Sequence, residues 1–413
     1  MRIAVVGSGV SGLTCAYLLA GAYDVTVFEK DGRLGGHTNT VPVEHEGRLL
    51  PVDTGFIVFN ERNYPNFCRL LDRLRVESRP TSMSFSVRDE SDGFEYGGAS
   101  LAGAIGSAGN LLRQRWWSVV SGVARLRRAG RAALESMPED ETIADLCASG
   151  LFSRGFLDGY LLPMGAAIWS APRTELMRFP ARFLLRFFDN HGMLDLRRRP
   201  QWRTIVGGSH RYVDAMMGAL KERVRLNRPV RSVRRSTGGV LVETSAGEEG
   251  FDEVILAAHS DESLALLADA TQAERETLAA LPYQTNDVVL HTDARLLPRR
   301  RRSWAAWNYL VGTNASDAAV VTYNMSILQG LDTREPLCVT LNAADRVDPA
   351  RIIRRFSYAH PLYTVMGERA RDRWREISGV NRTHYCGAYW GDGFHEDGVN
   401  SALRVCQRLG VEL

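Results

Sequence analysis

The first thirty residues constrain the fold more than any other part of the chain. An apolar run at residues 2–6 leads into the glycine-rich turn Gly7-Ser8-Gly9-Val10-Ser11-Gly12, and an apolar stretch suited to a helix covers residues 13–20. A second apolar run, residues 24–28, ends in Glu29. A strand, a glycine turn, a helix and a second strand in this order predict the first βαβ unit of a parallel α/β sheet.

The residues of this turn suit the binding of a dinucleotide. Gly7 permits a tight turn, Gly9 lets the backbone approach a pyrophosphate, and Gly12 lets the helix pack closely on the strand. The helix N-terminus, at Val10 and Ser11, offers free N–H groups and the positive end of a dipole to the phosphates. Glu29 lies 22 positions after Gly7, where its carboxylate can accept hydrogen bonds from ribose hydroxyls.

Two other interpretations compete with a dinucleotide site. Arg2, the apolar run and Ala20-Gly21-Ala22 imitate a secretory signal, but three glycines interrupt the run and a strand follows at once. The other alternative is an ordinary glycine turn between a strand and a helix. The complete order of strand, turn, helix, strand and acid favours the dinucleotide site, while the turn leaves open which dinucleotide binds.

Length and composition narrow the class of protein further. A chain of 413 residues is long enough for two domains. A net charge of +3 makes no electrostatic case for nucleic acid. Six scattered cysteines without a CxxC pair indicate free thiols and a reducing, cytoplasmic compartment. The absence of an unbroken apolar run of membrane-spanning length predicts no transmembrane helix.

Patterning along the chain predicts two interleaved domains. Strands are expected at 84–87, 94–96, 224–226, 230–233, 240–242, 252–258, 287–293, 304–311, 318–324 and 337–341, and helices at 64–74, 348–356, 366–375, 399–409 and over most of 99–188. We expect an α/β dinucleotide-binding domain from residues 1–75, 204–265 and 380–413. A substrate-binding domain of mixed sheet plus helices would come from residues 76–203 and 266–379. Because ligand sites favour domain interfaces, we expect the reaction between the two domains.

A second glycine motif follows the acidic strand tip. Arg33-Leu34-Gly35-Gly36-His37 precedes Asp53-Thr54-Gly55. A glycine pair lets the backbone pass close to a bulky ligand, and it places Arg33 near the pyrophosphate as a charge partner. An ordinary surface turn is the alternative for this segment.

Together these motifs resemble the FAD-binding start of the amine oxidase, phytoene desaturase and protoporphyrinogen oxidase superfamily. Residues 227–233 are similar to the strand whose backbone contacts adenine there, and residues 386–402 resemble the closing flavin motif. The resemblance implies a three-layer, Rossmann-type FAD-binding domain like that of glutathione reductase. It implies non-covalent FAD, because an SGGCY attachment motif is missing. The implied cofactor-binding residues are Gly7, Gly9, Val10, Ser11, Gly12, Glu29, Lys30, Arg33, Gly35, Gly36, His37, Asp53, Thr54, Gly55, Val230, Gly387, Asp392, Glu396 and Val399.

The same resemblance implies transfer of a hydride from a substrate C–H bond to flavin N5. Three segments, residues 35–40, 52–66 and 386–402, look closest to a bacterial subgroup of amine-oxidoreductase-like proteins. Some relatives of that subgroup resemble fatty acyl desaturases. The only two lysines, Lys30 and Lys221, do not suit the lysine position near N5 of typical amine oxidases. We therefore expect an FAD-dependent oxidoreductase that desaturates an apolar lipid or fatty acyl substrate. A double-bond isomerase, an amine oxidase and a non-enzymatic FAD- or NAD-binding protein are the alternatives.

The segments expected to form the substrate-binding domain indicate their function less clearly than the cofactor motifs do. Residues 111–131 mix arginines with Trp116 and Trp117, which suits either a helix at the headgroup boundary of a membrane's inner face or a helix packed on its own domain. The aromatic cluster at 178–188 suits an apolar tunnel or a core. The arginine runs 197–199 and 299–302 suit solvated loops or contacts with phosphate head groups.

Residues near the C-terminus supply the candidates for catalysis. His395 is the first choice for an acid/base group, and Tyr389 and Trp390 for an aromatic wall beside the flavin. We expect no metal site, because the adjacent residues His395, Glu396 and Asp397 rarely converge on one ion. The electron acceptor and the oligomeric state stay open.

Overall fold

A parallel sheet lies at the centre of one lobe of the molecule. The computed structural model describes residues 1–195, 199–312 and 318–413. The strand order is β10-β2-β1-β14-β20, and each neighbouring pair is parallel. The strands are β1 (Arg2–Val6), β2 (Asp24–Phe28), β10 (Val224–Arg225), β14 (Glu253–Leu256) and β20 (Thr383–Tyr385). All five come from the three segments expected to bind the dinucleotide.

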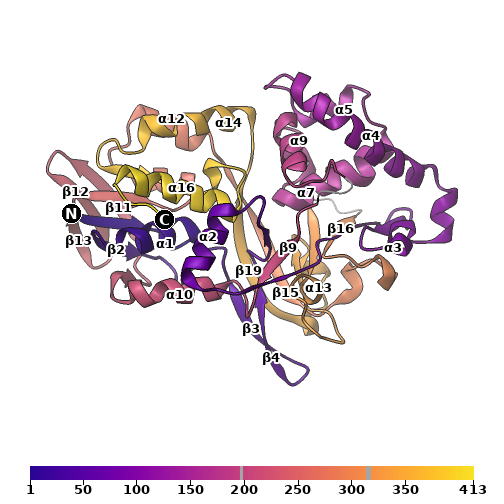
Figure 1. Cartoon of the computed structure of the whole chain (residues 1–413), viewed down its shortest axis with the longest axis horizontal. Helices are drawn as coiled ribbons and strands as arrows, with labels where there is room; N and C mark the ends of the chain where they lie inside the picture. The colour runs from indigo at the N-terminus through magenta and orange to yellow at the C-terminus, as the bar shows by residue number, and fades with distance from the viewer. Residues whose placement is uncertain (196–198, 313–317) are drawn as a thin grey trace.

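Helices and an antiparallel meander complete three layers around this sheet (Figure 1). The helices are α1 (Val10–Leu19), α2 (Pro65–Leu74), α10 (His210–Leu220) and α16 (His395–Arg408). The meander is β11 (Val230–Ser236), β12 (Gly239–Thr244) and β13 (Gly247–Phe251). α1 contacts α10 and α16, whereas the meander contacts β1 and β14, so the sheet lies between the helices and the meander. This confirms the predicted three-layer α/β domain.

A second, mixed sheet forms the other lobe (Figure 1). Its strand order is β19-β15-β18-β17-β16-β7-β8, and only β16 and β7 run parallel. The strands are β7 (Phe85–Asp89), β8 (Glu95–Gly97), β15 (Tyr283–His291), β16 (Trp307–Val311), β17 (Val320–Asn324), β18 (Cys338–Leu341) and β19 (Ile352–Pro361). The nearby helices are α3 (Leu101–Ile105), α4 (Gln114–Ser136), α5 (Ile143–Ala148), α6 (Arg154–Phe156), α7 (Leu162–Trp169), α8 (Arg173–Leu176) and α9 (Ala181–Asn190).

Smaller elements connect the two lobes. The hairpin of β3 (Thr40–His45) and β4 (Arg48–Asp53) belongs to the first segment of the chain, yet its valines share a core with Val288 and Leu290 of the second sheet. β5 (Phe59–Asn60), β9 (Trp202–Ile205) and β6 (Ser78–Pro80) form a small sheet where the chain passes between the lobes. The two-domain division stays a proposal. The remaining helices are α11 (Ser260–Leu266), α12 (Gln272–Ala279), α13 (Met325–Leu328), α14 (Val365–Asp372) and α15 (Trp374–Ile377).

Two predicted helices differ from the structure. Residues 348–356 are not a helix, because β19 begins at Ile352 and pairs along its length with β15. The final helix begins at His395 rather than at residue 399, because the carboxylate of Asp397 accepts the backbone N–H of Phe394 at 2.9 Å and caps the first turn. Both changes bring additional side chains to the space between the lobes.

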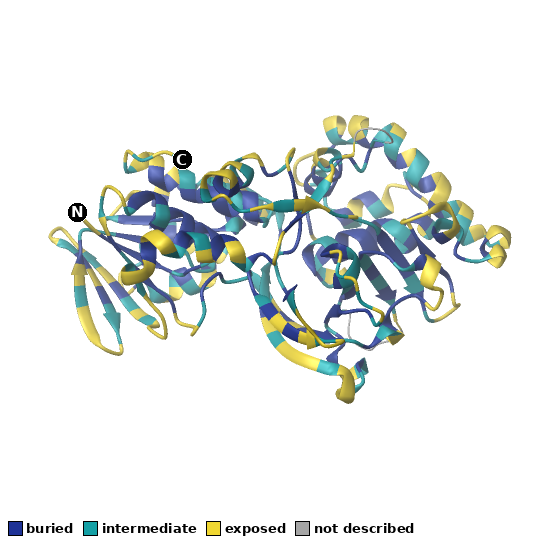
Figure 2. Cartoon of the chain, turned by 60° about the horizontal axis from the view of Figure 1, so that its bottom comes forward, coloured by how far each residue is buried: buried dark blue, intermediate teal, exposed yellow. Residues whose placement is uncertain are grey.

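Burial follows the two sheets (Figure 2). The inner strands of both sheets are largely buried, whereas the meander, the β3–β4 hairpin and β19 carry many exposed residues, as do the outer helix faces and loops. Within the three described ranges, no helix has both the length and the hydropathy needed to cross a bilayer.

Candidate active site

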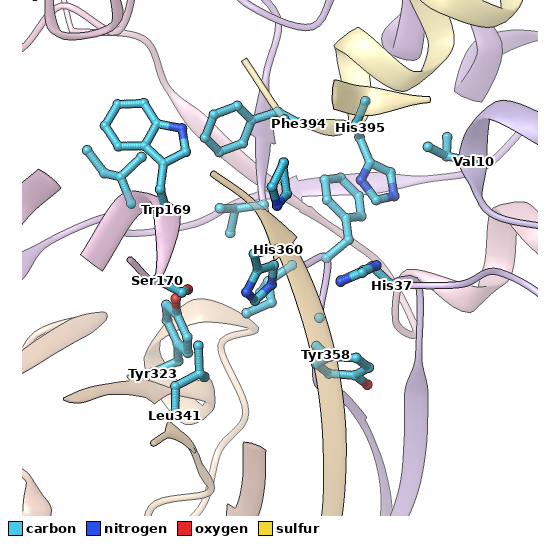
Figure 3. Close-up of a pocket in the computed structure, with 18 of the residues that line it drawn as sticks. Val10, His37, Trp169, Ser170, Tyr323, Leu341, Tyr358, His360, Phe394 and His395 are labelled. Carbon is cyan, nitrogen blue, oxygen red and sulfur yellow. The ribbon is translucent and has the colours of Figure 1, made fainter. Parts of the chain in front are cut away.

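A cavity of about 1530 Å³ lies between the two sheets and is lined from both (Figure 3). One end is formed by the loops that follow β1 and β2, and the other reaches the helices α4 and α7. Such a cavity is large enough for a dinucleotide and a second molecule beside it.

The two glycine loops are bound to each other at the first end. The N–H of Gly35 donates to the carbonyl of Ser8 at 3.0 Å, and Gly9 forms an isolated parallel bridge with Gly35. Gly7 has a φ of +104°, and a Cβ atom on Gly12 would lie 2.0 Å from the carbonyl oxygen of Gly7. These positions therefore require glycine, as the motif predicts.

Gly9 differs, because a Cβ atom there would meet nothing within 4 Å. It lines the cavity and is the N-cap of α1, where no side chain caps the helix. The first N–H groups of α1 are thus available to a ligand, and the open space beside Gly9 accommodates phosphate oxygens.

Most predicted cofactor-binding residues lie in the cavity wall: Gly7, Gly9, Val10, Ser11, Glu29, Lys30, Arg33, Gly35, Gly36, His37, Thr54, Gly55, Val230 and Gly387. Glu29 is buried and accepts the N–H groups of Ser8 at 3.0 Å and Asp31 at 2.9 Å. Lys30 reaches outward to Glu262, with 2.6 Å between its Nζ and the carboxylate. The wall thus presents a dinucleotide with glycine backbone, an acid at the tip of β2 and cations nearby.

Five predicted residues lie behind the wall instead. Gly12 allows the packing of α1, and Val399 is buried within α16. The carboxylate of Asp53 accepts the N–H and the hydroxyl of Ser209, each at 2.8 Å, and burial raises the pKa of Asp53 to about 6. This network joins β4 to the start of α10, so Asp53 has a structural contact where a cofactor contact was expected.

Glu396 and Asp392 are the other two. Glu396 accepts the N–H groups of Asn66 at 3.0 Å and Phe67 at 2.9 Å, so its carboxylate caps the first turn of α2. The carbonyl of Asp392 accepts the indole N–H of Trp169 at 3.2 Å. These contacts fix the closing segment onto neighbouring helices, while Gly393, Phe394 and His395 face the cavity.

His395 lines the cavity but is tightly held. Its ring stacks on Phe56 with 3.5 Å between centroids, and its Nε2 lies 3.0 Å from Thr38 Oγ1 and 3.2 Å from Tyr212 Oη. Burial lowers the pKa of His395 to about 3, so the imidazole is neutral. This geometry favours positioning over proton transfer, and the acid/base role stays a prediction.

The predicted aromatic pair is divided by the wall. Tyr389 lines the cavity, and Trp390 packs beside it with 5.1 Å between ring centroids, outside the wall. Of the two, Tyr389 alone can contact a ligand in the cavity.

A group of aromatic and histidine side chains around His37 was not expected from the sequence. The ring of His37 lies 5.3 Å from that of His360 and 5.1 Å from that of Tyr358, and Figure 3 shows all three at the cavity. His37 Nε2 is buried with no hydrogen-bond partner among the residues described. Burial, reinforced by the neighbouring His360 and His259, holds the pKa of His37 well below its usual value.

An unpartnered buried nitrogen is costly, so this position calls for a ligand with polar edge atoms, which a flavin ring has. Tyr358 and His360 were missed because the segment before them was expected to be a helix. The alternation of Phe356, Tyr358 and His360 with small residues was the signal of a strand.

The far half of the cavity is mainly apolar. One face of α4 lines it through Trp116, Val119, Val120, Val123, Ala124 and Arg127, opposite Met164, Ile168 and Trp169 of α7. From the cluster at 178–188, Phe187 lines the wall, whereas Phe183 and Phe188 are buried in the core of the lobe. The cluster is therefore mostly core, and the tunnel wall is supplied chiefly by α4 and α7.

A parallel α/β sheet with two joined glycine loops, closed by a second sheet over a long cavity, defines a dinucleotide-dependent enzyme. The chain belongs to the family of flavin-containing amine oxidoreductases, whose model matches residues 10–310, more than half of its length. It is an FAD-dependent oxidoreductase. The joined glycine loops, the uncapped helix and the unpartnered His37 fit this cofactor.

Solved structures with the same fold have varied activities. The chain is similar to a CLA-producing fatty acid isomerase from P. acnes, with a TM-score of 0.70 and 18% identity over 98% of each chain. It is also similar to a putrescine oxidase bound to putrescine, with a TM-score of 0.69 and 14% identity over 99% of each chain. Its similarity to cyclohexylamine oxidase from Brevibacterium oxydans IH-35A has a TM-score of 0.67 and 14% identity over 99% of each chain.

One match in sequence is short. It covers 47 residues, 11% of this chain, and is 49% identical to an L-amino-acid oxidase from Pseudechis australis. The matched part is only 9% of that oxidase, so the match carries no information on substrate.

Proposed function

We propose that the protein removes two hydrogens from the long apolar chain of a lipid or fatty acyl substrate and leaves a carbon–carbon double bond. The observation that carries this proposal is the apolar wall of the far half of the cavity. Its aliphatic and aromatic side chains on α4 and α7 suit an alkyl chain, because burying apolar surface is the main source of affinity there.

The reaction is a two-electron oxidation. When bound, FAD supplies the acceptor for one hydrogen with its electron pair, and dioxygen or a quinone takes these electrons onward. The second hydrogen leaves as a proton to the solvent. The chain's own residues bind the alkyl chain and hold it beside the group around His37.

The charges of the wall argue against an amine substrate. Its acidic residues, Glu29, Asp31, Asp261 and Glu262, belong to the loops and the helix at the dinucleotide end. In the far half, the charged side chains among the residues described are two arginines, Arg127 and Arg199, which would repel an ammonium group. Lys30 pairs with Glu262, and Lys221 is exposed beyond α10, so neither lysine reaches the far half.

A fatty acid double-bond isomerase is the second candidate. The likeness in fold to a fatty acid isomerase favours it, and the same apolar wall would hold an unsaturated chain. Isomerisation moves a hydrogen out and back within the site, so it needs no external electron acceptor.

Anaerobic incubation of the oxidised holoprotein separates these functions. The probes are palmitate, a dipalmitoyl phospholipid, linoleate and cyclohexylamine. Lasting loss of the yellow flavin absorbance with palmitate or the phospholipid, together with a product lighter by two hydrogens, supports desaturation. A rearranged linoleate with the flavin still oxidised supports isomerisation, and bleaching by cyclohexylamine alone overturns both.

We also propose that an anionic membrane surface delivers the substrate. Leu101, Leu112 and Trp117 are 86%, 91% and 55% exposed, and they lie on or beside α3 and α4. The exposed arginine run 299–302 packs against α3, where Arg302 Nε donates to the carbonyl of Gly106 at 2.9 Å. Exposed apolar side chains beside arginines suit the headgroup boundary, and Val120 belongs both to this surface and to the cavity wall.

Vesicle sedimentation tests the membrane contact. We expect binding to phosphatidylglycerol vesicles and much weaker binding to phosphatidylcholine vesicles. L112E combined with W117E should release the protein, whereas M366E should not, because Met366 is 72% exposed on α14, outside this surface. Equal binding of all variants, or no binding to either vesicle, would overturn this contact.

A further inference from the structure

Two arginines interrupt the apolar half of the cavity without an acidic partner. Arg127 and Arg199 both line it, and neither forms an ion pair with any residue in the described ranges. Other arginines of the same helix are paired: Arg115 lies 2.7 Å from Asp89, and Arg131 lies 2.8 Å from Asp189. Arg125 and Arg128 of α4 also form no ion pair with a described residue, but both are exposed and neither lines the cavity. Arg127 is therefore the unpaired arginine of this helix that lines the cavity.

Arg127 also has an unsatisfied donor. Its Nε is buried and has no hydrogen-bond partner among the described residues. Both arginines line the same half of the cavity, and burial together with the like charge of Arg199 lowers the pKa of Arg127. A desolvated cation beside a like charge is costly, and an anion between the two groups would remove that cost.

The position of Arg127 along α4 relates this charge to the apolar wall. Trp116, Val119, Val120, Val123 and Ala124 precede it at spacings of three and four residues, which keeps all six side chains on one helix face. From Trp116 to Arg127 the helix rises by about 16 Å at 1.5 Å per residue. An apolar strip with a cation at one end matches a molecule with an alkyl chain and an anionic head.

Solvent reaches one of the two arginines. Arg199 is exposed, whereas Arg127 is half-buried. A head group held by both would lie at the boundary between cavity and water, with its alkyl chain directed along α4 into the cavity. A charged head in that place keeps part of its hydration, which limits the desolvation cost of binding.

We propose that Arg127, together with Arg199, binds the anionic head of the substrate, a carboxylate or a phosphate, through charge-assisted hydrogen bonds. This inference rests on the proposed apolar substrate and adds the chemical class of its head. It makes Arg127 a specificity-determining residue, because a neutral ester or an amine would leave the guanidinium groups unpaired.

Binding to the oxidised holoprotein under anaerobic conditions tests the proposal without a measurement of turnover. The probes are palmitate, methyl palmitate and palmitoyl lysophosphatidate, each titrated against displacement of a fluorescent alkyl ligand. We expect palmitate or the lysophosphatidate to bind about tenfold or more tightly than the methyl ester. Preference for palmitate identifies a carboxylate head, and preference for the lysophosphatidate identifies a phosphate head.

The variants are R127Q and R199Q, with R128Q as the matched control, since Arg128 is the exposed neighbour on α4 and does not line the cavity. R127Q should reduce the anion preference to about twofold or less and leave the affinity for the ester unchanged. R199Q should weaken it partially, and R128Q should not change it. R199Q and the ester comparison on the wild type keep the test decisive if R127Q does not fold.

Failure of this subsite is distinguishable from failure of the proposed function. If the ester and palmitate bind the wild type equally, or if R127Q retains the full anion preference, the subsite is overturned and the apolar substrate stands. If none of the three alkyl probes binds the holoprotein, both proposals are overturned.

Discussion

The carboxylate of Glu396 accepts the backbone N–H of Phe67 at 2.9 Å, and this bond joins the segment that closes the flavin site to the first turn of α2. The residue resembles a cofactor ligand in the sequence, but its contacts are those of a helix cap. We therefore expect E396A to lower the free energy of unfolding by about 1 kcal/mol. The Kd for FAD should stay within about twofold of the wild-type value, which is a change in binding free energy of less than about half a kcal/mol. Urea unfolding and FAD titration measure the two quantities, and weaker FAD binding at unchanged stability would contradict the capping role.

Two glycines of the N-terminal turn should respond differently to alanine. A Cβ atom on Gly12 would lie 2.0 Å from a backbone oxygen, so G12A should destabilise the protein by about 2–3 kcal/mol. Gly9 has a φ of −65° and open space, so G9A should fold normally and bind FAD about tenfold or more weakly. Apoprotein melting and flavin titration check both, with G21A as control, since a Cβ atom on Gly21 meets nothing within 4 Å. Normal FAD affinity in G9A would argue against phosphates at this position.

The packing of α4 depends on one glycine. A Cβ atom on Gly122 would lie 2.2 Å from the ring of Phe156, and this ring is fully buried. G122A should lower the free energy of unfolding by about 2–3 kcal/mol, because α4 must shift to make room for the methyl group. Since α4 forms part of the cavity wall, the shift should also weaken the binding of alkyl ligands. Calorimetry and the alkyl displacement assay measure this, with G109A as control, since its Cβ atom would approach no atom closer than 3.7 Å. Unchanged stability in G122A would mean that Phe156 can rearrange freely.

Acid should destabilise the protein partly through His291, which lies in β15 away from the cavity wall. Burial lowers the pKa of His291 from 6.5 to about 4, and its Nδ1 accepts the N–H of Asp293 at 3.0 Å. Between these pKa values the unfolded chain binds a proton that the folded chain does not, so stability falls as the pH falls through this window. In H291Q the loss of stability between pH 7 and pH 5 should be smaller by about 1–2 kcal/mol. Chemical unfolding at both pH values measures the difference, and an equally steep loss in the variant would contradict it.

The cofactor half was largely predictable because its motifs act through the backbone. Gly7, Gly35 and Gly36 adopt positive φ angles, and such positions restrict the sequence strongly enough to be recognised in isolation. Acidic residues are harder to assign, since a carboxylate suits a ribose hydroxyl, a helix N-terminus or a buried hydroxyl equally well. The resemblance implied that Asp53 and Glu396 bind the cofactor, whereas long-range partners decide the contacts of both carboxylates.

The substrate half was harder to predict, because its structure depends on the pairing of strands that lie far apart in the sequence. Residues 348–356 contain a helix-compatible pattern, and the strand β19 forms because β15 lies beside it over its full length. His360 reaches the cavity only through this pairing. The role proposed for Arg127 was likewise invisible in the sequence. Its distinguishing property is a buried Nε without a described partner at the cavity wall, whereas Arg125 and Arg128 beside it are exposed.

The central position of β1 has a consequence for synthesis of the chain. Ile3 pairs with Glu253, and Val254 of the same strand pairs in turn with Thr383, so the cofactor sheet joins the beginning, middle and end of the polypeptide. On the ribosome β1 can pair with β2 early, but β14 joins β1 only after residue 256 and the edge strand β20 joins β14 only after residue 385. A nascent chain stalled before residue 383 would therefore lack both β20 and Gly387 of the cavity wall, so its nucleotide site would be unfinished.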